Sequence, residues 1–160
     1  MPEPSKSATK PVMTGGCQCG AVRYALMSEP TGASICHCRM CQKAFGSYFA
    51  PLTGVPWRDL VWVRGTPATF QSSEAAERGF CRDCGTPLTF RYVDKDRICV
   101  SLGSLDEPAR VMPDKQYGLE ARLPFLEAIL QAPGSRTEDD VSPQDRARLR
   151  SRQHPDHQAE

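Results

Sequence analysis

The 160-residue sequence lacks several features that would place it in a common class at once. No apolar run approaches the ~20 residues of a membrane span, and the opening segment lacks the apolar stretch of a signal peptide. Neither sign of charge is in excess, with 20 basic and 19 acidic residues, which disfavours a protein built to bind nucleic acid or an acidic membrane. We therefore expect a cytoplasmic protein with neither a membrane nor a nucleic acid as partner.

The chain is also not short enough to need disulfides for stability. A domain of this length buries roughly two thirds of the surface of its unfolded chain, so it can build an ordinary hydrophobic core. A reducing cytosol keeps thiols free for metal binding or catalysis. The eight cysteines therefore call for a chemical explanation.

Composition divides the chain into three parts. Residues 1–13 are rich in Pro, Ser, Lys and Thr without hydrophobic periodicity, which predicts a disordered N-terminal segment. Residues 14–132 alternate short apolar stretches with Gly and Pro, as expected of a single β-rich domain. Residues 133–160 are polar and charged, which predicts a flexible C-terminal tail, with a short helix capped by Ser142 and Pro143 and running through Arg152.

Period-two alternation predicts the strands of a mainly β fold. In residues 20–26, for example, Val22, Tyr24 and Leu26 would share one face. Residues 60–65 form a further candidate strand. Residues 88–93 and 97–102 are separated by a short polar turn, which predicts an antiparallel hairpin.

Seven of the eight cysteines fall into three tight groups, with spacings that are difficult to produce by chance. The groups are Cys17 with Cys19, then Cys36, Cys38 and Cys41, then Cys81 with Cys84. The eighth, Cys99, has no cysteine nearby in the sequence and is interpreted as a half-buried strand thiol.

A closed structural zinc site requires four ligands, and two of the groups together supply four thiolates. A Cys-x-x-Cys turn directs two sulfurs at one cation, and Gly85 after Cys84 permits a positive φ. We call Cys17, Cys19, Cys81 and Cys84 the four-cysteine cluster, and expect it to join distant strands through one zinc ion.

Cys36, Cys38 and Cys41, the three-cysteine cluster, leave one position of a tetrahedral zinc free, which is typical of a catalytic site. Three thiolates weaken the ion as an activator of water and suit it to a soft thiol partner. Two alternatives stay open: His37 as a fourth ligand that closes the site, and disulfide pairing in place of zinc. The alternation of an extended segment turns His37 away from its neighbours and favours the open site.

The motifs GGCQCGAVRY, CHCRMCQKAFGSYF, RGFCRDCGTPLTF and SLGSLDEP resemble those of the glutathione-dependent formaldehyde-activating enzyme family, which includes centromere protein V, over residues 14–126. The resemblance implies a zinc-binding β-tent of folded antiparallel sheets. It also implies two zinc ions per chain, a structural one on the four-cysteine cluster and a catalytic one on the three-cysteine cluster.

The activity that this resemblance implies is a carbon–sulfur lyase reaction, which interconverts S-(hydroxymethyl)glutathione with glutathione and formaldehyde. Cys36, Cys38 and Cys41 are then the catalytic residues, and Arg39, Lys43 and Arg78 are candidates to bind the carboxylates of the thiol. The chain departs from the family pattern at Gln116, where relatives often carry His, and at Phe125, where Trp is common.

Two alternative functions share the cysteine pattern. The same fold can act on a different thiol or aldehyde, since a scaffold does not determine a substrate. A non-catalytic zinc module that binds a protein partner is the other, although the sequence has no Lys/Arg-rich run for chromatin. The sequence indicates no particular oligomeric state.

Overall fold

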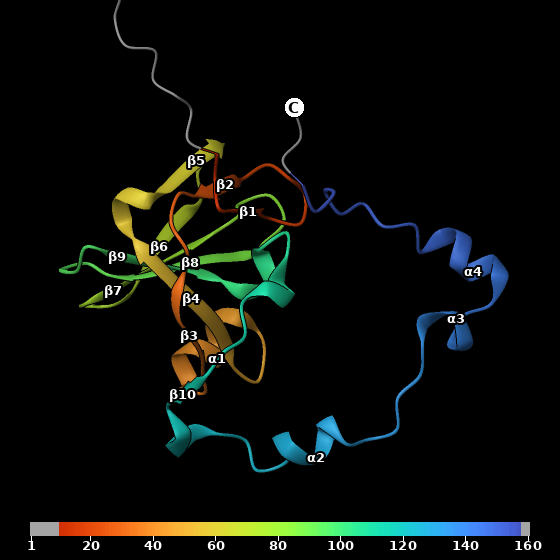
Figure 1. Cartoon of the computed structure of the whole chain (residues 1–160). Helices are drawn as coiled ribbons and strands as arrows, with labels where there is room; N and C mark the ends of the chain where they lie inside the picture. Colours follow the sequence, from red (N-terminus) through yellow and green to blue (C-terminus); the bar gives the residue numbers. More distant parts are fainter. Residues whose placement is uncertain (1–9, 158–160) are drawn as a thin grey trace, which may run out of the picture.

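The computed structural model describes residues 10–157, and its regular core consists of two β-sheets (Figure 1). The disorder predicted for residues 1–9 lies outside the described residues. The first strand begins at Met13, which is buried, so the last residue of the predicted N-terminal segment belongs to the folded domain. The expectation of a mainly β, single-domain fold is confirmed.

The smaller sheet has three antiparallel strands in the order β1-β2-β5. They are β1 (Met13–Gly16), β2 (Arg23–Leu26) and β5 (Leu60–Arg64). All four residues of β2 are buried, and because successive side chains point to opposite faces, this central strand is covered on both sides.

The larger sheet has seven strands in the order β10-β3-β4-β9-β8-β7-β6. The predicted hairpin of β8 and β9 is confirmed as an antiparallel pair. One pairing departs from the antiparallel expectation, because β10 lies parallel to β3. The strands are β3 (Thr31–Cys36), β4 (Ala50–Pro56), β6 (Ala68–Ser73), β7 (Ala76–Phe80), β8 (Pro87–Tyr92), β9 (Arg97–Ser101) and β10 (Lys115–Tyr117).

The main hydrophobic core joins the two sheets. Leu26 from the small sheet belongs to the same buried cluster as Leu88 and Val100 from the large one. Two metal-ligand candidates, Cys17 and Cys81, are part of this core and are 3% and 1% exposed. One side of the four-cysteine cluster is therefore built into the packing between the sheets, while Cys19 is exposed.

The helices are short, and among the described α-helices only α1 (Arg39–Phe45) lies between strands of the β domain. In Figure 1 the three C-terminal helices lie apart from the two sheets. Among residues 10–157 no helix has the length and apolar character needed to cross a membrane. The remaining helices are α2 (Leu126–Leu130), α3 (Thr137–Asp140), α4 (Pro143–Arg148) and the 3₁₀ turns Trp57–Asp59, Leu102–Ser104, Pro108–Arg110 and Leu119–Ala121.

The C-terminal helix α4 begins at the predicted cap, with Ser142 accepting a hydrogen bond from the N–H of Asp145. It ends at Arg148 instead of Arg152. All six of its residues are exposed, and so short a helix without a packed face gains too little to propagate further. Beyond it the chain returns to the β domain, where the N–H of His154 donates to the carbonyl of Gln18 over 2.7 Å.

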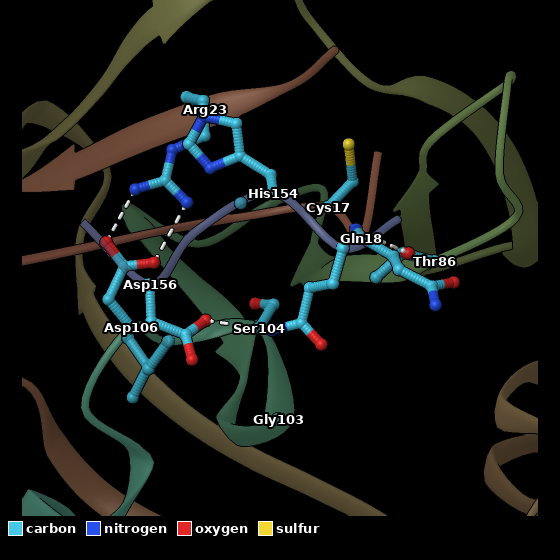
Figure 2. Close-up of a pocket in the computed structure, with 12 residues that line it drawn as sticks. Cys17, Gln18, Arg23, Thr86, Gly103, Ser104, Asp106, His154 and Asp156 are labelled. Carbon is cyan, nitrogen blue, oxygen red and sulfur yellow. Dashed lines mark hydrogen bonds and ion pairs between the residues drawn. The ribbon is translucent and has the colours of Figure 1, made fainter. Parts of the chain in front are cut away.

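A buried ion pair links the small sheet to the segment after β9. Arg23 on β2 is 3% exposed and donates two hydrogen bonds, of 2.9 and 2.5 Å, to the carboxylate of Asp106 (Figure 2). The hydroxyl of Thr14 on β1 donates to the same carboxylate. Burial opposes the ionisation of Asp106, but Arg23 and Thr14 outweigh it and hold the pKa of this carboxyl below its usual value.

Replacing Asp106 by asparagine should reduce the free energy of unfolding by about 3 kcal/mol, because it leaves the buried charge of Arg23 without a counter-ion. Urea unfolding of the metal-loaded protein measures this. Asp96→Asn is the control, since the Arg58–Asp96 pair is 73% exposed on both sides and should contribute less than about 0.5 kcal/mol.

The same ion pair predicts an acid dependence of stability. The folded pKa of Asp106 is lowered, so the stabilisation is complete above the unfolded value of about 4 and is lost as the pH falls through the folded value. Asp106→Asn should remove this part of the acid dependence. Equal acid sensitivity in the variant and the unchanged protein would contradict the assignment.

Candidate metal centres

The four-cysteine cluster forms where a turn of the small sheet meets a turn of the large sheet. Cys17 and Cys19 follow β1, and Cys81 and Cys84 lie between β7 and β8. The sulfurs of all four lie within 4.8 Å of one another. Sixty-two residues separate Cys19 from Cys81, so only the tertiary structure brings these turns together.

Glycines shape both turns, and the positive φ of Gly85 was predicted from the sequence. Gly20 has φ of 78° and donates its N–H to the carbonyl of Cys17 over 3.1 Å. Gly85 has φ of 77° and donates to the carbonyl of Cys81 over 2.9 Å. These left-handed conformations suit glycine and let each pair of cysteines point the same way.

The sulfur geometry of the four-cysteine cluster fits a tetrahedral zinc. Zinc–sulfur bonds of about 2.3 Å in a tetrahedron place neighbouring sulfurs about 3.8 Å apart. The Sγ atoms of Cys17 and Cys19 are 3.5 Å apart, and those of Cys19 and Cys81 are 3.8 Å apart. Four soft donors at this spacing could hold one zinc ion as a closed site.

Hydrogen bonds to the sulfurs differentiate the thiols of this cluster. The N–H of Val22 donates to Cys17 over 3.2 Å, and the Thr86 hydroxyl lies 3.1 Å from the sulfur of Cys84. Burial raises the pKa of Cys81 to about 12. Burial also opposes the ionisation of Cys84, but contacts with Thr86 outweigh it and lower the pKa of this thiol to about 6. The surroundings therefore favour the thiolate form at Cys84 and disfavour it at Cys81.

The three-cysteine cluster forms where β3 leads into the helix α1. Cys36 ends β3, Cys38 caps the N-terminus of α1, and Cys41 lies in the first turn of that helix. Their sulfurs are within 4.8 Å of one another and could hold a metal ion through three thiolates. The N–H of Cys41 donates to the sulfur of Cys38 over 3.4 Å, and Gly118 packs directly against Cys38.

The thiols of this cluster also differ in acidity. Burial raises the pKa of Cys36 to about 12. Burial opposes the ionisation of Cys38 too, but the N–H of Cys41, the neighbouring thiols and the charge of Arg78 outweigh it and lower the pKa of Cys38. Of Cys36 and Cys38, the thiol at the helix cap is thus the more acidic.

A buried arginine completes the surroundings of this cluster. Arg78 on β7 is 4% exposed, and its Nη2 donates to the sulfur of Cys41 over 3.2 Å. The sequence named Arg78 as a candidate carboxylate ligand, and the structure places it beside a sulfur. Nothing in the spacing predicts this contact, because 37 residues separate Arg78 from Cys41.

His37 is fully buried, and its ring lies apart from the three sulfurs that could bind a metal. Its Nε2 is 2.9 Å from the side-chain oxygen of Gln116, and the ring edge packs on Phe49. The side chain of Gln42 also donates to the carbonyl of His37. His37 therefore fixes the loop that carries Cys36 and Cys38, and Gln116, a departure from the family pattern, is its partner.

The other two basic candidates, Arg39 and Lys43, are exposed on α1. Lys43 lines two shallow grooves beside the helix, of about 300 and 320 Å³. One groove is apolar, with Met40, Ala44 and Phe70 in its wall, and Arg39 lines the other. Both grooves lie next to the helix that carries Cys41.

A further hollow of about 140 Å³ lies beside the four-cysteine cluster (Figure 2). Cys17, Gln18 and Thr86 line one side of it, and the returning C-terminal segment with His154 lines another. The ion pair of Arg23 with Asp106 forms the charged part of its wall. The hollow does not include any residue of the three-cysteine cluster.

None of the eight cysteines, all of which fall within residues 10–157, forms a disulfide. Cys99 on β9 belongs to neither cluster of potential metal ligands and is half buried, as predicted. Burial raises the pKa of its thiol, and Arg97 offsets this in part. It is a packing residue beside the small apolar cluster that contains Cys41.

Comparison with known proteins identifies the family. The family model described as "Glutathione-dependent formaldehyde-activating enzyme" matches residues 12–120, which contain both cysteine clusters. The chain belongs to this family. The name of the family and the name of one relative, a lyase, both support a function of the glutathione-dependent formaldehyde-activating type.

Two similar proteins place the family match in context. An "uncharacterized lyase" from Schizosaccharomyces pombe is 32% identical over 84 residues, which cover 52% of this chain and 61% of the relative. The chain thus spans less than two thirds of that curated relative. A crystal structure of a Rhodobacter sphaeroides protein has a TM-score of 0.53 at 26% identity, and the match covers 65% of this chain and 99% of the other.

Proposed function

We propose that this member of the family is a zinc-dependent carbon–sulfur lyase that interconverts S-(hydroxymethyl)glutathione with glutathione and formaldehyde. The observation that carries the proposal is the three-cysteine cluster, which offers three sulfurs to a metal ion and no fourth ligand from the described residues. Three protein ligands and one free position are typical of catalytic zinc. The four-cysteine cluster would hold the second, structural zinc.

Cys36, Cys38 and Cys41 would hold the catalytic ion, and zinc bound there would supply a site for the soft sulfur of the substrate. In the condensing direction, the thiolate sulfur attacks the carbonyl carbon of formaldehyde. A carbon–sulfur bond forms, the π electrons of the carbonyl move to oxygen, and the oxygen takes a proton. The lyase reaction is the reverse of these steps.

The chain's own residues contribute mainly by positioning. The buried loop around His37 and the cap of α1 hold the cysteines in place, which favours attack geometry in the bound state. Arg39 and Lys43, exposed on the helix α1, are our candidates to bind the carboxylates of glutathione.

The cytoplasmic location stays a prediction from the sequence, since a reducing compartment keeps cysteines free for metal binding.

An exchange experiment tests the proposed activity. The protein is mixed with glutathione and ¹³C-formaldehyde, and exchange between the free and adduct signals is followed by NMR. We expect faster exchange than in buffer containing the same concentration of metal-stripped protein. No acceleration rejects the proposal, and acceleration with other thiols but not glutathione identifies the same fold acting on a different substrate.

A further inference from the structure

The two cysteine clusters differ in the charge of their immediate surroundings. The four-cysteine cluster receives its hydrogen bonds from neutral groups, namely the N–H of Val22 and the hydroxyl of Thr86. In the three-cysteine cluster a guanidinium donates to the sulfur of Cys41. Within residues 10–157, Arg78 is the one cationic side chain that is hydrogen-bonded to a sulfur of either cluster.

Arg78 is held rigidly in this position. Its Nε donates to the hydroxyl of Ser72 over 2.9 Å, and the guanidinium lies over the ring of Phe90 at 4.9 Å from the centroid. Its Nη1 is buried without a hydrogen-bond partner in the described structure. A buried charge with an unpaired donor is costly, so a compensating anionic partner is needed.

The charge of the cluster provides that partner. Three thiolates on a divalent ion carry one net negative charge, and a fourth thiolate from outside raises this to two. A fixed positive charge in contact with the cluster stabilises the doubly negative state more than the singly negative one. Arg78 therefore favours binding of an additional thiolate over binding of neutral water.

We propose that Arg78 is a positioning residue that allows the three-cysteine site to accept an external thiol as thiolate, with the thiol proton released to solvent. This inference rests on the proposed function and assigns Arg78 to the sulfur end of the substrate. It differs from the role suggested by the sequence, in which Arg78 binds a distant carboxylate. The two roles predict different responses to a thiol without carboxylates.

The test uses the protein loaded with Co²⁺, whose sulfur-to-metal charge-transfer absorption reports each added thiolate. Glutathione and 2-mercaptoethanol, which has no carboxylate, are titrated separately. Arg78→Gln keeps a donor but loses the charge, and should weaken the binding of both thiols by about tenfold or more. Arg78→Lys, which keeps the charge, should restore much of the affinity for both.

Arg91→Met is the matched control. Arg91 follows Phe90 on the adjacent strand β8, so its side chain belongs to the opposite face of the sheet from Arg78 and Phe90. Like Arg78, it lies over an aromatic ring, that of Trp57. Its replacement should leave both thiol affinities unchanged. Equal affinities in Arg78→Gln and the unchanged protein overturn the inference, and so does a loss confined to glutathione, which indicates carboxylate binding.

The same titration separates this inference from the proposed function. If the unchanged protein shows no spectral response to either thiol, the proposed thiol chemistry fails. If the unchanged protein responds and Arg78→Gln responds equally, only the role of Arg78 fails. Should Arg78→Gln not fold, the neutral and apolar Arg78→Met, which can still pack on Phe90, carries the same comparison with both thiols.

Discussion

Replacing Cys81 by serine should abolish cooperative folding of the domain. Cys81 is 1% exposed and belongs to the core between the sheets. Its sulfur is one of four that lie close enough to one another to bind a single zinc ion. Structural zinc contributes about 10–16 kcal/mol in small domains, which is comparable to the about 5–15 kcal/mol of a whole protein's stability. Circular dichroism during heating and the metal content of the purified variant measure this.

Cys99→Ser is the control for this prediction, because Cys99 is half buried on β9 and lies outside both clusters. It should retain both metal ions and unfold close to the temperature of the unchanged protein. A stable, cooperative Cys81→Ser variant would contradict the structural role of the four-cysteine cluster.

Replacing Cys38 by serine should abolish lyase activity while the domain remains folded. Cys38 caps α1 at the edge of the fold and is outside the main core, so the loss of its sulfur affects one metal ion and little of the packing. We expect one zinc ion per chain to remain, and the rate of adduct exchange to fall to that of buffer. Metal analysis and the NMR exchange experiment measure the two effects.

The comparison of these two variants tests the division of the cysteines into a structural and a catalytic group. Serine at position 38 can still cap the helix through its oxygen, so unfolding would not follow from the loss of the cap. Equal loss of folding in Cys38→Ser and Cys81→Ser would reject the division. Full activity in Cys38→Ser would reject the catalytic assignment.

Much of the architecture could be predicted from local pattern. Alternating apolar residues predicted the strand around Tyr24 and the β8–β9 hairpin, since the period of two depends only on neighbours in the chain. The spacing of the cysteines predicted both clusters, and glycine identified the turns. The parallel pairing of β10 with β3 was not predicted, because its register depends on where a long connection returns.

The charged groups around the sites were the least predictable part. The contact of Arg78 with Cys41 and the ion pair of Arg23 with Asp106 join residues far apart in the sequence. Burial of His37 beside Gln116 likewise depends on β10 lying against β3. No local periodicity encodes which of the chain's many arginines becomes buried against a sulfur or a carboxylate.

The sequence by itself determined which atoms are available: seven cysteines in three groups, sorted by number and spacing into four and three. Only the tertiary structure decided how these atoms are charged and supported. It placed Cys17 and Cys81 of the four-cysteine cluster in the core between two sheets and a guanidinium against one sulfur of the three-cysteine cluster. The physical reason is that ligand identity is a local property of the chain, whereas burial and electrostatic environment arise only when distant segments pack together.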